Sequence, residues 1–371
     1  MTSCSNKENF GAKEITLHDE PYPATFVKEK EVIVEALTKR SIPHFARVDD
    51  KNHIYIKFRN GDGNHEIWKY NASCELLKKF MFKYGQGPQE AIKPIILGGT
   101  PDRIVIYDIT YRRLLFWNSI VDNCVMEKRS LITHEFPSNG FGYSPKHRCA
   151  LIWEEIDPPP GVKTKINVYL KNVNKESAGE RKLHELEYTF FNRDVNGNFN
   201  YWPSRPFHCI MLKDFVFLVN LKDYVLYKYD LMGTLLKKVK VGFHHKRFSA
   251  HQLKEWERSY EVKKSDLHFP GELWPACWLI SLDSGFIVGR REDYSSSNKN
   301  WICADYYDIS LQYMGKIKMP WFERWNDPFY CQTNADLKIL GKDKYLYLIE
   351  EDEEGNGDYV LRRWRFTREK R

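Results

Sequence analysis

Short apolar segments recur along the chain and are separated by polar turns. Each is rich in β-branched or aromatic residues and too short for a typical helix, so the pattern favours buried β-strands. Six such segments occur, at His53 to Phe58, Arg103 to Asp108, Ala150 to Glu155, Phe215 to Asn220, Gly285 to Arg290 and Lys344 to Glu351.

A second strand is predicted after each of these, because apolar and polar residues then alternate. Alternation is typical of a strand with one solvated and one packed face. These segments are Glu66 to Asn71, Arg113 to Ser119, Lys165 to Asn172, Val225 to Gly233, Cys303 to Leu311 and Tyr359 to Phe366. A third, basic and apolar segment follows in the first five units, for example from Leu76 and from Leu235.

Prolines mark a further strand at the start of each unit. They are Pro43, Pro94, Pro145, Pro206, Pro275 and Pro328, at intervals of 51, 51, 61, 69 and 53 residues. Proline is tolerated at the first position of a strand, where its missing N–H lies outside the ladder. Four strands in about fifty residues, repeated six times, predict an all-β, six-bladed β-propeller with four-stranded antiparallel blades. An ordinary β-sandwich is the alternative.

The sixth unit lacks a fourth strand, because the chain ends at Arg371 soon after the segment Tyr359 to Phe366. An exposed edge of this kind needs a partner. The apolar stretch from Phe26 to Leu37 is predicted to close the ring as the outer strand of the last blade. The domain assignment is therefore a tail or tether over residues 1–24 and a single propeller over residues 25–371.

One segment departs from the strand pattern. Ser249 is a candidate helix N-cap with Gln252 three residues on, and Leu253, Trp256 and Tyr260 share one helical face. We expect a helical insertion near residues 249–262, between the fourth and fifth blades. It could form a lid over one end of the ring or cap an exposed sheet edge.

Composition agrees with a folded β-protein: 15% of residues are aromatic and the formal net charge is +7. The longest apolar runs fall well short of the roughly 20 residues of a membrane-spanning helix. Basic residues are dispersed among acidic ones, so nucleic-acid binding is not indicated, and RNA binding through a basic face is a weaker alternative.

Eight cysteines occur without CxxC or zinc-finger spacing, and we expect mostly core thiols with no structural metal. Near the N-terminus, Thr2 to Asn6 is similar to the end of a bacterial lipobox, which makes Cys4 a candidate lipidation site. A chance cysteine in a polar tail is the alternative reading. The expected location is the bacterial cell envelope or periplasm, or the cytoplasm if the N-terminus is complete.

The glycine-rich segment Tyr84 to Glu90 resembles the GxGPGE turn of bacterial six-bladed β-propeller proteins related to NHL repeats, many of which are predicted lipoproteins. Gln89 stands where that motif has a glycine, and Ala91 where it has an aromatic residue. The phrase YKYDLMGTLLKKV and the C-terminal strand pair are also similar to that family. The resemblance implies the fold over nearly the whole chain and leaves the activity open, since propellers host unrelated functions.

No catalytic signature is present: the sequence has no GxSxG elbow, HExxH motif or P-loop. His208 and the pair His244 and His245 invite a metal hypothesis, yet adjacent residues of a strand point to opposite faces. The acidic run from Glu350 to Gly355 lacks the spacing of a calcium loop. We expect no cofactor.

A ligand would bind at one end of the central channel, where loops leading into the innermost strands converge. Aromatic and basic residues of these loops suit a peptide, a glycan or an anionic ligand, although they could instead fill the space between blades. The candidates are Tyr143, Lys146, Arg205, His208, Trp274, Trp278, Trp325 and Tyr330.

The sequence thus favours a non-enzymatic propeller that binds a peptide, glycan or protein and is exported or associated with the cell envelope. The alternative is a metal-dependent, lactonase-like or lyase-like propeller enzyme, which would need a metal in the channel and a general base.

Overall fold

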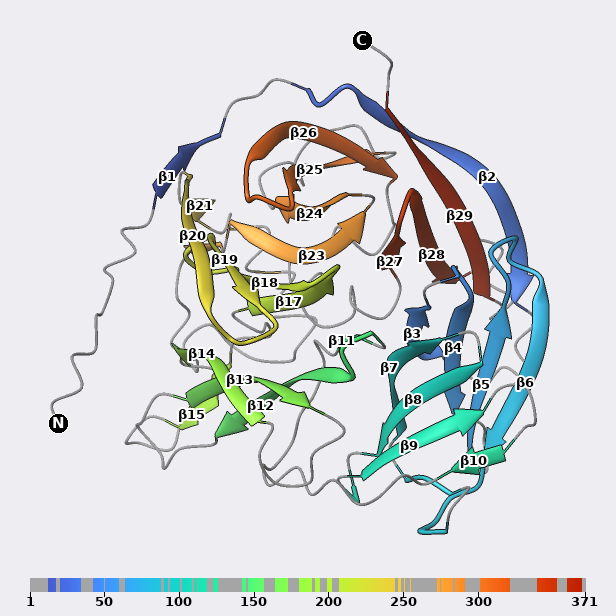
Figure 1. The fold of residues 1–371 in the computed structure, drawn as a ribbon. Helices are drawn as coiled ribbons and strands as arrows, with labels where there is room; N and C mark the ends of the chain where they lie inside the picture. Colours follow the sequence, from blue (N-terminus) through green and yellow to red (C-terminus); the bar gives the residue numbers. More distant parts are fainter. Residues whose placement is uncertain are drawn as a thin grey trace, which may run out of the picture.

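A computed structural model gives the fold (Figure 1). It describes residues 13–17, 21–34, 43–49, 51–59, 64–87, 90–92, 94–100, 102–108, 110–111, 113–118, 123–125, 142–144, 146–156, 164–172, 180–188, 191–193, 199–201, 207–243, 246–247, 250, 254, 272–273, 275–282, 284–290, 301–320, 339–351 and 359–368.

Six four-stranded antiparallel sheets form the blades of a propeller, which confirms the predicted fold class and blade number. Blade 1 comprises β3 (Pro43–Val48), β4 (Ile54–Arg59), β5 (His65–Tyr70) and β6 (Leu76–Phe82). Blade 2 comprises β7 (Pro94–Thr100), β8 (Arg103–Asp108), β9 (Arg113–Asn118) and β10 (Asn123–Val125). Blade 3 comprises β11 (Gly142–Ser144), β12 (Cys149–Ile156), β13 (Thr164–Asn172) and β14 (Glu180–Tyr188).

The other three blades follow the same order along the chain, from the innermost strand outward. Blade 4 comprises β17 (Phe207–Leu212), β18 (Phe215–Asn220), β19 (Val225–Asp230) and β20 (Leu235–Gly242). Blade 5 comprises β23 (Ala276–Leu282), β24 (Gly285–Arg290), β25 (Trp301–Asp308) and β26 (Tyr313–Pro320). Blade 6 comprises β27 (Ile339–Lys342), β28 (Tyr345–Glu351), β29 (Tyr359–Arg368) and the N-terminal β2 (Ala24–Val34).

The innermost strands contact one another in the order β3, β7, β11, β17, β23 and β27, and β27 also contacts β3. Two short pairs lie outside the blades: β15 (Phe191–Arg193) with β16 (Phe199–Tyr201), and β21 (Lys246–Arg247) with β22 (Glu272–Leu273). We call the end of the ring where the innermost strands begin the loop end, and the end where they finish the turn end. Because neighbouring strands are antiparallel, the second strand of each blade finishes at the loop end.

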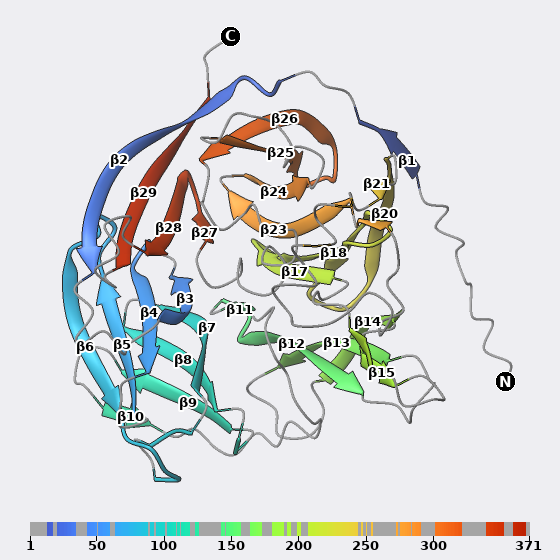
Figure 2. The same cartoon turned by 180° about the vertical axis from the view of Figure 1, so that it is seen from behind.

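The N-terminal segment runs along the outer strands of three successive blades (Figure 2). β1 (Lys13–Thr16) pairs in parallel with β20 of blade 4, and the backbone N–H of Tyr22 donates to the carbonyl of Lys316 in blade 5 at 2.6 Å. β2 then pairs antiparallel with β29, from Ala24 opposite Arg368 to Val34 opposite Tyr359. Part of the stretch over residues 1–24 is thus hydrogen-bonded to the blades.

Buried apolar side chains form six clusters, one at each junction between neighbouring blades. The cluster between blades 6 and 1 joins Tyr347 and Leu361 to Ile56 and Trp68, and so links the two ends of the chain. Blades therefore pack face to face, and most of the free energy of burial comes from contacts between blades.

This packing corrects one expectation. The alternating segments, which form the third strand of each blade, were expected to have one solvated face. In β5 and β9, however, nearly every residue is buried, because a neighbouring blade covers each face. Alternation with exposed residues instead marks the outermost strands, such as β6, where the blades diverge.

Prolines begin two of the innermost strands as predicted, with Pro43 at the start of β3 and Pro94 at the start of β7. β11, the innermost strand of blade 3, ends at Ser144, and Pro145 lies outside the described residues. The predicted helix near residues 249–262 lies almost entirely outside the described residues.

A side-chain amide or carboxylate builds the turn between the third and fourth strands of blades 1, 4 and 5. The side chains are those of Asn71, Asp230 and Asp308. In each, one oxygen accepts the backbone N–H groups of the residues two and four positions later. Three residues further on the backbone is left-handed, at Cys74, Gly233 and Leu311, with φ of 62°, 84° and 60°. Cys74 and Leu311 are fully buried, so packing offsets the strain of this conformation.

Candidate functional site

Buried polar and ionisable side chains gather at the loop end of the ring. Seven occur where a second strand finishes, a third strand begins or an innermost strand begins. They are Lys57, His65, Asp108, Arg113, His208, Asn220 and Arg290, each at most 8% exposed. Buried charges are costly unless they are paired, so their partners show what this end of the ring is built to hold.

Two residues of blade 1 fasten the start of blade 2. The ammonium group of Lys57 donates to the carbonyl of Pro94 at 2.9 Å, and Nε2 of His65 lies 2.8 Å from the carbonyl oxygen of Ile92. Ile92 lies just before β7, and Pro94 is its first residue. Two side chains of blade 1 therefore fix the entry into the innermost strand of blade 2.

Arg113 holds the glycine-rich loop that precedes this link. Its guanidinium donates to the carbonyl of Gln86 at 2.6 Å and to that of Glu90 at 2.5 Å. Its Nε lies 3.5 Å from the carboxylate of Asp108, which is fully buried and also accepts the N–H of Thr110 at 3.2 Å. The planar, five-donor guanidinium suits several acceptors at once.

The loop itself folds around the side chain of Glu90. The carboxylate accepts the N–H of Gly87 at 2.7 Å, and the carbonyl of Gly87 accepts the N–H of Glu90 at 3.1 Å. Gly85 has φ of 155°, and a Cβ on it would overlap the Glu90 carboxylate. Tyr84 is 59% exposed, and Gln86 is also exposed. The motif quoted for the family resemblance is thus a tightly bonded loop that presents polar and aromatic side chains to solvent.

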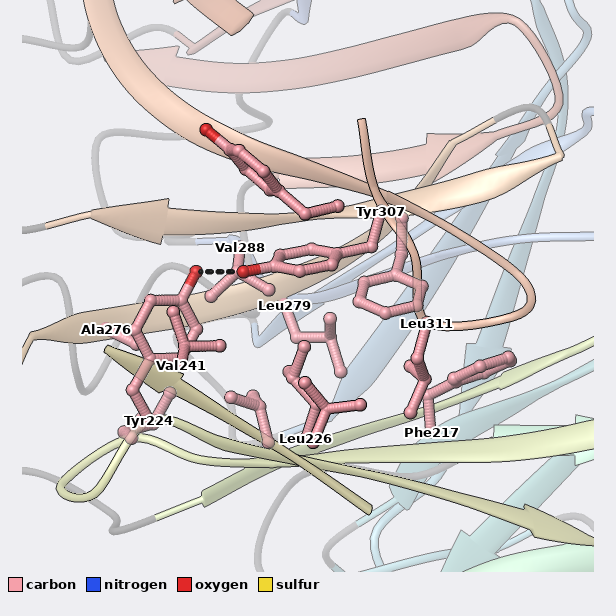
Figure 3. Close-up of a cluster of buried hydrophobic side chains, with 14 residues drawn as sticks. Phe217, Tyr224, Leu226, Val241, Ala276, Leu279, Val288, Tyr307 and Leu311 are labelled. Carbon is pink, nitrogen blue, oxygen red and sulfur yellow. Dashed lines mark hydrogen bonds between the residues drawn. The ribbon is translucent and has the colours of Figure 1, made fainter. Parts of the chain in front are cut away.

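A second buried polar cluster lies between blades 4 and 5, where Arg290 forms an ion pair with Asp305 at 2.6 Å. The Tyr224 hydroxyl donates to the other carboxylate oxygen of Asp305. It also accepts a hydrogen bond from the Tyr307 hydroxyl at 3.2 Å (Figure 3). Burial raises the pKa of Tyr224 and Tyr307 well above the usual value, so both stay neutral. Asp305 is fully buried, so solvent does not reach this cluster.

Four of the predicted rim residues lie within the described part of the chain. Tyr143 sits on innermost strand β11, half-buried, 3.5 Å from where a Cβ on Gly98 would stand, and burial raises its pKa. His208 sits near the start of β17 and is buried. Arg205, Trp274, Trp325, Tyr330 and Cys4 lie outside the described residues.

Two of the predicted rim residues need correction. Trp278 is 1% exposed and packs in the cluster between blades 5 and 6, with its indole ring against Gly289, where a Cβ would overlap it. Lys146 lies at the turn end, after β11, and forms an ion pair with Asp214 at 3.1 Å beside His147. The alternating pattern of the sequence could not show on which side of a blade, or at which end of a strand, a residue would lie.

The sequence analysis did not single out Lys57, Asp108, Arg113 or Arg290 as functional candidates. The sequence did mark three of them as unusual, because Lys57, Asp108 and Arg290 are charged residues at or near the end of an otherwise apolar segment. A charge in that position is costly to bury without a specific partner. The partners themselves come from loops that a local pattern does not identify.

Within the described part of the chain, Cys74, Cys149 and Cys209 are buried free thiols. Burial raises the pKa of Cys74 to about 11 and also raises that of Cys149. The residues that the structure describes contain no group of three or more His, Cys, Asp or Glu side chains placed to hold a metal ion. Nor does any helix among them have the length and apolar character needed to cross a membrane.

Comparison with known proteins supports the fold. No protein-family model matches the sequence, and no curated protein matches it significantly. Among solved structures, a DUF4221 family member from Bacteroides vulgatus ATCC 8482 aligns with a TM-score of 0.56 and 11% identity, over 94% of this chain and 100% of that one. A candidate exported protein from Bacteroides fragilis NCTC 9343 aligns with a TM-score of 0.50 and 12% identity, over 97% of this chain and 100% of that one.

Proposed function

We propose that this chain is an exported, non-enzymatic β-propeller that binds a peptide, a glycan or a partner protein at the loop end of its ring. The observation that carries the proposal is that the Arg113 guanidinium donates hydrogen bonds to two backbone carbonyls of the glycine-rich loop. A loop fixed in one conformation before binding loses little conformational entropy when a ligand arrives.

The exposed residues of that loop have the chemistry of a recognition surface. Tyr84 offers a flat aromatic face with a polar tip, and Gln86 offers an amide that both donates and accepts hydrogen bonds. Tyr143 extends this surface toward the innermost strands in our proposal, and His208, Trp274, Arg205, Trp325 and Tyr330 remain candidate contacts.

The partners of the buried charges also favour binding over catalysis. Lys57 and Arg113 donate to backbone carbonyls, and Arg290 pairs with Asp305. Groups used in this way position loops and are not poised to exchange protons with a substrate.

Glycan and peptide arrays probed with the purified protein test the proposal, with hits measured by calorimetry. We expect Tyr84→Ala and Trp274→Ala to weaken binding of a hit at least tenfold. Met232→Ala is the matched control, because Met232 is exposed in an outer turn of blade 4. Equal affinity of all three variants for every hit would overturn the proposal. A stoichiometric divalent ion found by elemental analysis would instead favour the lactonase-like or lyase-like enzyme.

Export and lipidation are part of the same proposal, with the propeller in residues 25–371 and a tail or tether in residues 1–24, of which Lys13–Thr16 and Tyr22 lie against blades 4 and 5. Support comes from the lipobox-like residues around Cys4 and from the name of the Bacteroides fragilis fold neighbour. Labelling of the full-length gene product with a fatty-acid analogue tests the anchor. Label should appear on the parent protein and disappear in Cys4→Ser.

A further inference from the structure

Tyr84 stands out among the aromatic residues of this protein. It is 59% exposed, more than any other aromatic side chain whose burial the structure describes. Within the described part of the chain, its ring has no aromatic or cationic neighbour and its hydroxyl has no hydrogen-bond partner. Most of the other rings pack between blades, so an exposed ring at the loop end marks a candidate contact surface.

Amide groups beside Tyr84 are also available to a ligand. Oδ1 of the partly exposed Asn64 accepts the backbone N–H of Tyr84 at 3.2 Å. Among the residues that the structure describes, neither the NH2 group of Asn64 nor the exposed side-chain amide of Gln86 has a partner. An amide NH2 group has two N–H donors, and an amide oxygen is an acceptor.

Blade 2 contributes a second ring to the same surface. The central carbon of the Arg113 guanidinium lies 5.1 Å from the centre of the Tyr111 ring, and Nη1 donates to the carbonyl of Gln86 at 2.6 Å. Tyr111 and the glycine-rich loop therefore lie against one side chain, and the exposed Thr110 precedes Tyr111. We call Asn64, Tyr84, Gln86, Thr110 and Tyr111 the tyrosine patch.

Charged groups around the tyrosine patch occur in pairs of opposite sign. Arg113 is paired with Asp108, and both are buried. Lys83 lies opposite Glu90 in an isolated bridge at the base of the glycine-rich loop. The patch itself consists of neutral donors, neutral acceptors and two aromatic rings, so a neutral ligand matches it better than an anion or a cation.

We propose, on the basis of the function proposed above, that the tyrosine patch binds a neutral glycan. A sugar ring has apolar C–H faces that pack on an aromatic ring, and hydroxyl groups at its edge that both donate and accept hydrogen bonds. Polyproline is the peptide class that also packs on tyrosine rings. It has no N–H groups to offer to the oxygens of Gln86 and Thr110, so the glycan is the better match.

Four probes test this inference on the full chain: the neutral cellohexaose and mannohexaose, the anionic hexagalacturonate, and a capped octaproline. Saturation-transfer NMR detects weak binding, and calorimetry measures the affinity. We expect a neutral hexasaccharide to bind, and hexagalacturonate and octaproline not to bind. Tyr84→Ala and Tyr111→Ala should each weaken saccharide binding at least tenfold, because each removes a ring on which a sugar packs.

Asn64→Asp separates contact with the glycan from support of the loop. The carboxylate keeps the acceptor for the N–H of Tyr84 but lacks the two amide donors. We expect it to weaken saccharide binding about fivefold, the effect of one hydrogen bond, without lowering the unfolding temperature. Tyr345→Ala is the matched control, because it removes a partly exposed tyrosine at the turn end of blade 6 and should leave the affinity unchanged.

Failure of this inference and failure of the proposed function give different results. Binding of hexagalacturonate or octaproline without any neutral saccharide overturns the glycan inference, and the proposed function stands if Tyr84→Ala abolishes that binding. Saccharide binding that persists in both Tyr84→Ala and Tyr111→Ala overturns the assignment to the tyrosine patch. If none of the four probes binds, the glycan inference is overturned, and the array hits decide the proposed function separately.

Discussion

Arg290 and Asp305 form an ion pair at 2.6 Å, and both side chains are withdrawn from solvent between blades 4 and 5. The Tyr224 hydroxyl donates to the same carboxylate from the neighbouring blade. A pair of charges in such a site stabilises the fold only while both members are present, because each one alone is a buried, uncompensated charge.

We therefore expect Asp305→Asn to lower the free energy of unfolding by about 3 to 5 kcal/mol. The double variant Arg290→Met/Asp305→Leu should lose less than Asp305→Asn alone, since it leaves no unpaired charge. Urea denaturation measures both. Tyr224→Phe, which removes both hydrogen bonds of the Tyr224 hydroxyl, should cost about 2 to 4 kcal/mol. A double variant that is less stable than the single one would contradict the account.

Trp278 is predicted to act in stability and not in ligand binding. Trp278→Ala should cost about 3 to 5 kcal/mol because it opens a cavity between blades 5 and 6. Gly289→Ala should also destabilise the protein, since the added Cβ would overlap the indole ring. Thermal unfolding reads both effects. Normal stability of Gly289→Ala would show that the ring does not occupy this position.

Cys74 makes stability fall at alkaline pH. Its pKa is raised by burial to about 11, above the ordinary value of 9.0, so the unfolded chain releases this proton first. Stability is unaffected below pH 9 and decreases between pH 9 and 11, by about 3 kcal/mol from this thiol. Cys74→Ala should flatten the loss in that window. Thiol labelling gives an independent measure, since Cys74 should react only as fast as the protein unfolds.

His184 should produce a loss of stability on the acid side. Burial lowers its pKa from 6.5 to about 4, and Nδ1 lies 2.7 Å from the Tyr229 hydroxyl. The unfolded chain takes up a proton first as pH falls, so stability is retained above pH 6.5 and lost between pH 6.5 and 4, by about 3 kcal/mol. His184→Gln should flatten this region. An unchanged slope of stability against pH in His184→Gln would contradict this account.

The N-terminal strand should be essential to the stability of blade 6. Phe26 is 4% exposed and its ring packs 5.4 Å from that of Phe366 on β29. Phe26→Ala should cost about 3 to 5 kcal/mol, whereas Val27→Ala, at a neighbouring but 44% exposed position, should cost under about 1 kcal/mol. Similar losses in the two variants would argue against the pairing of β2 with β29.

The strands and their grouping into blades can be predicted from the amino-acid sequence alone. Short apolar segments such as His53 to Phe58, alternating segments such as Glu66 to Asn71, and the spacing of prolines are all local, and local backbone preferences are enough to predict strands from them. The blade number followed because the same phrase repeats at a nearly constant interval.

The positions of side chains between and around the blades depend instead on contacts in the folded protein. Whether Trp278 faces solvent or a neighbouring blade, whether Arg113 reaches the loop at Gln86, and whether β1 pairs with β20 each depend on segments distant in the chain. A strand's own residues show that one of its faces is apolar, but the partner that covers that face is set by how six sheets pack around a ring, and this packing leaves no period in the sequence.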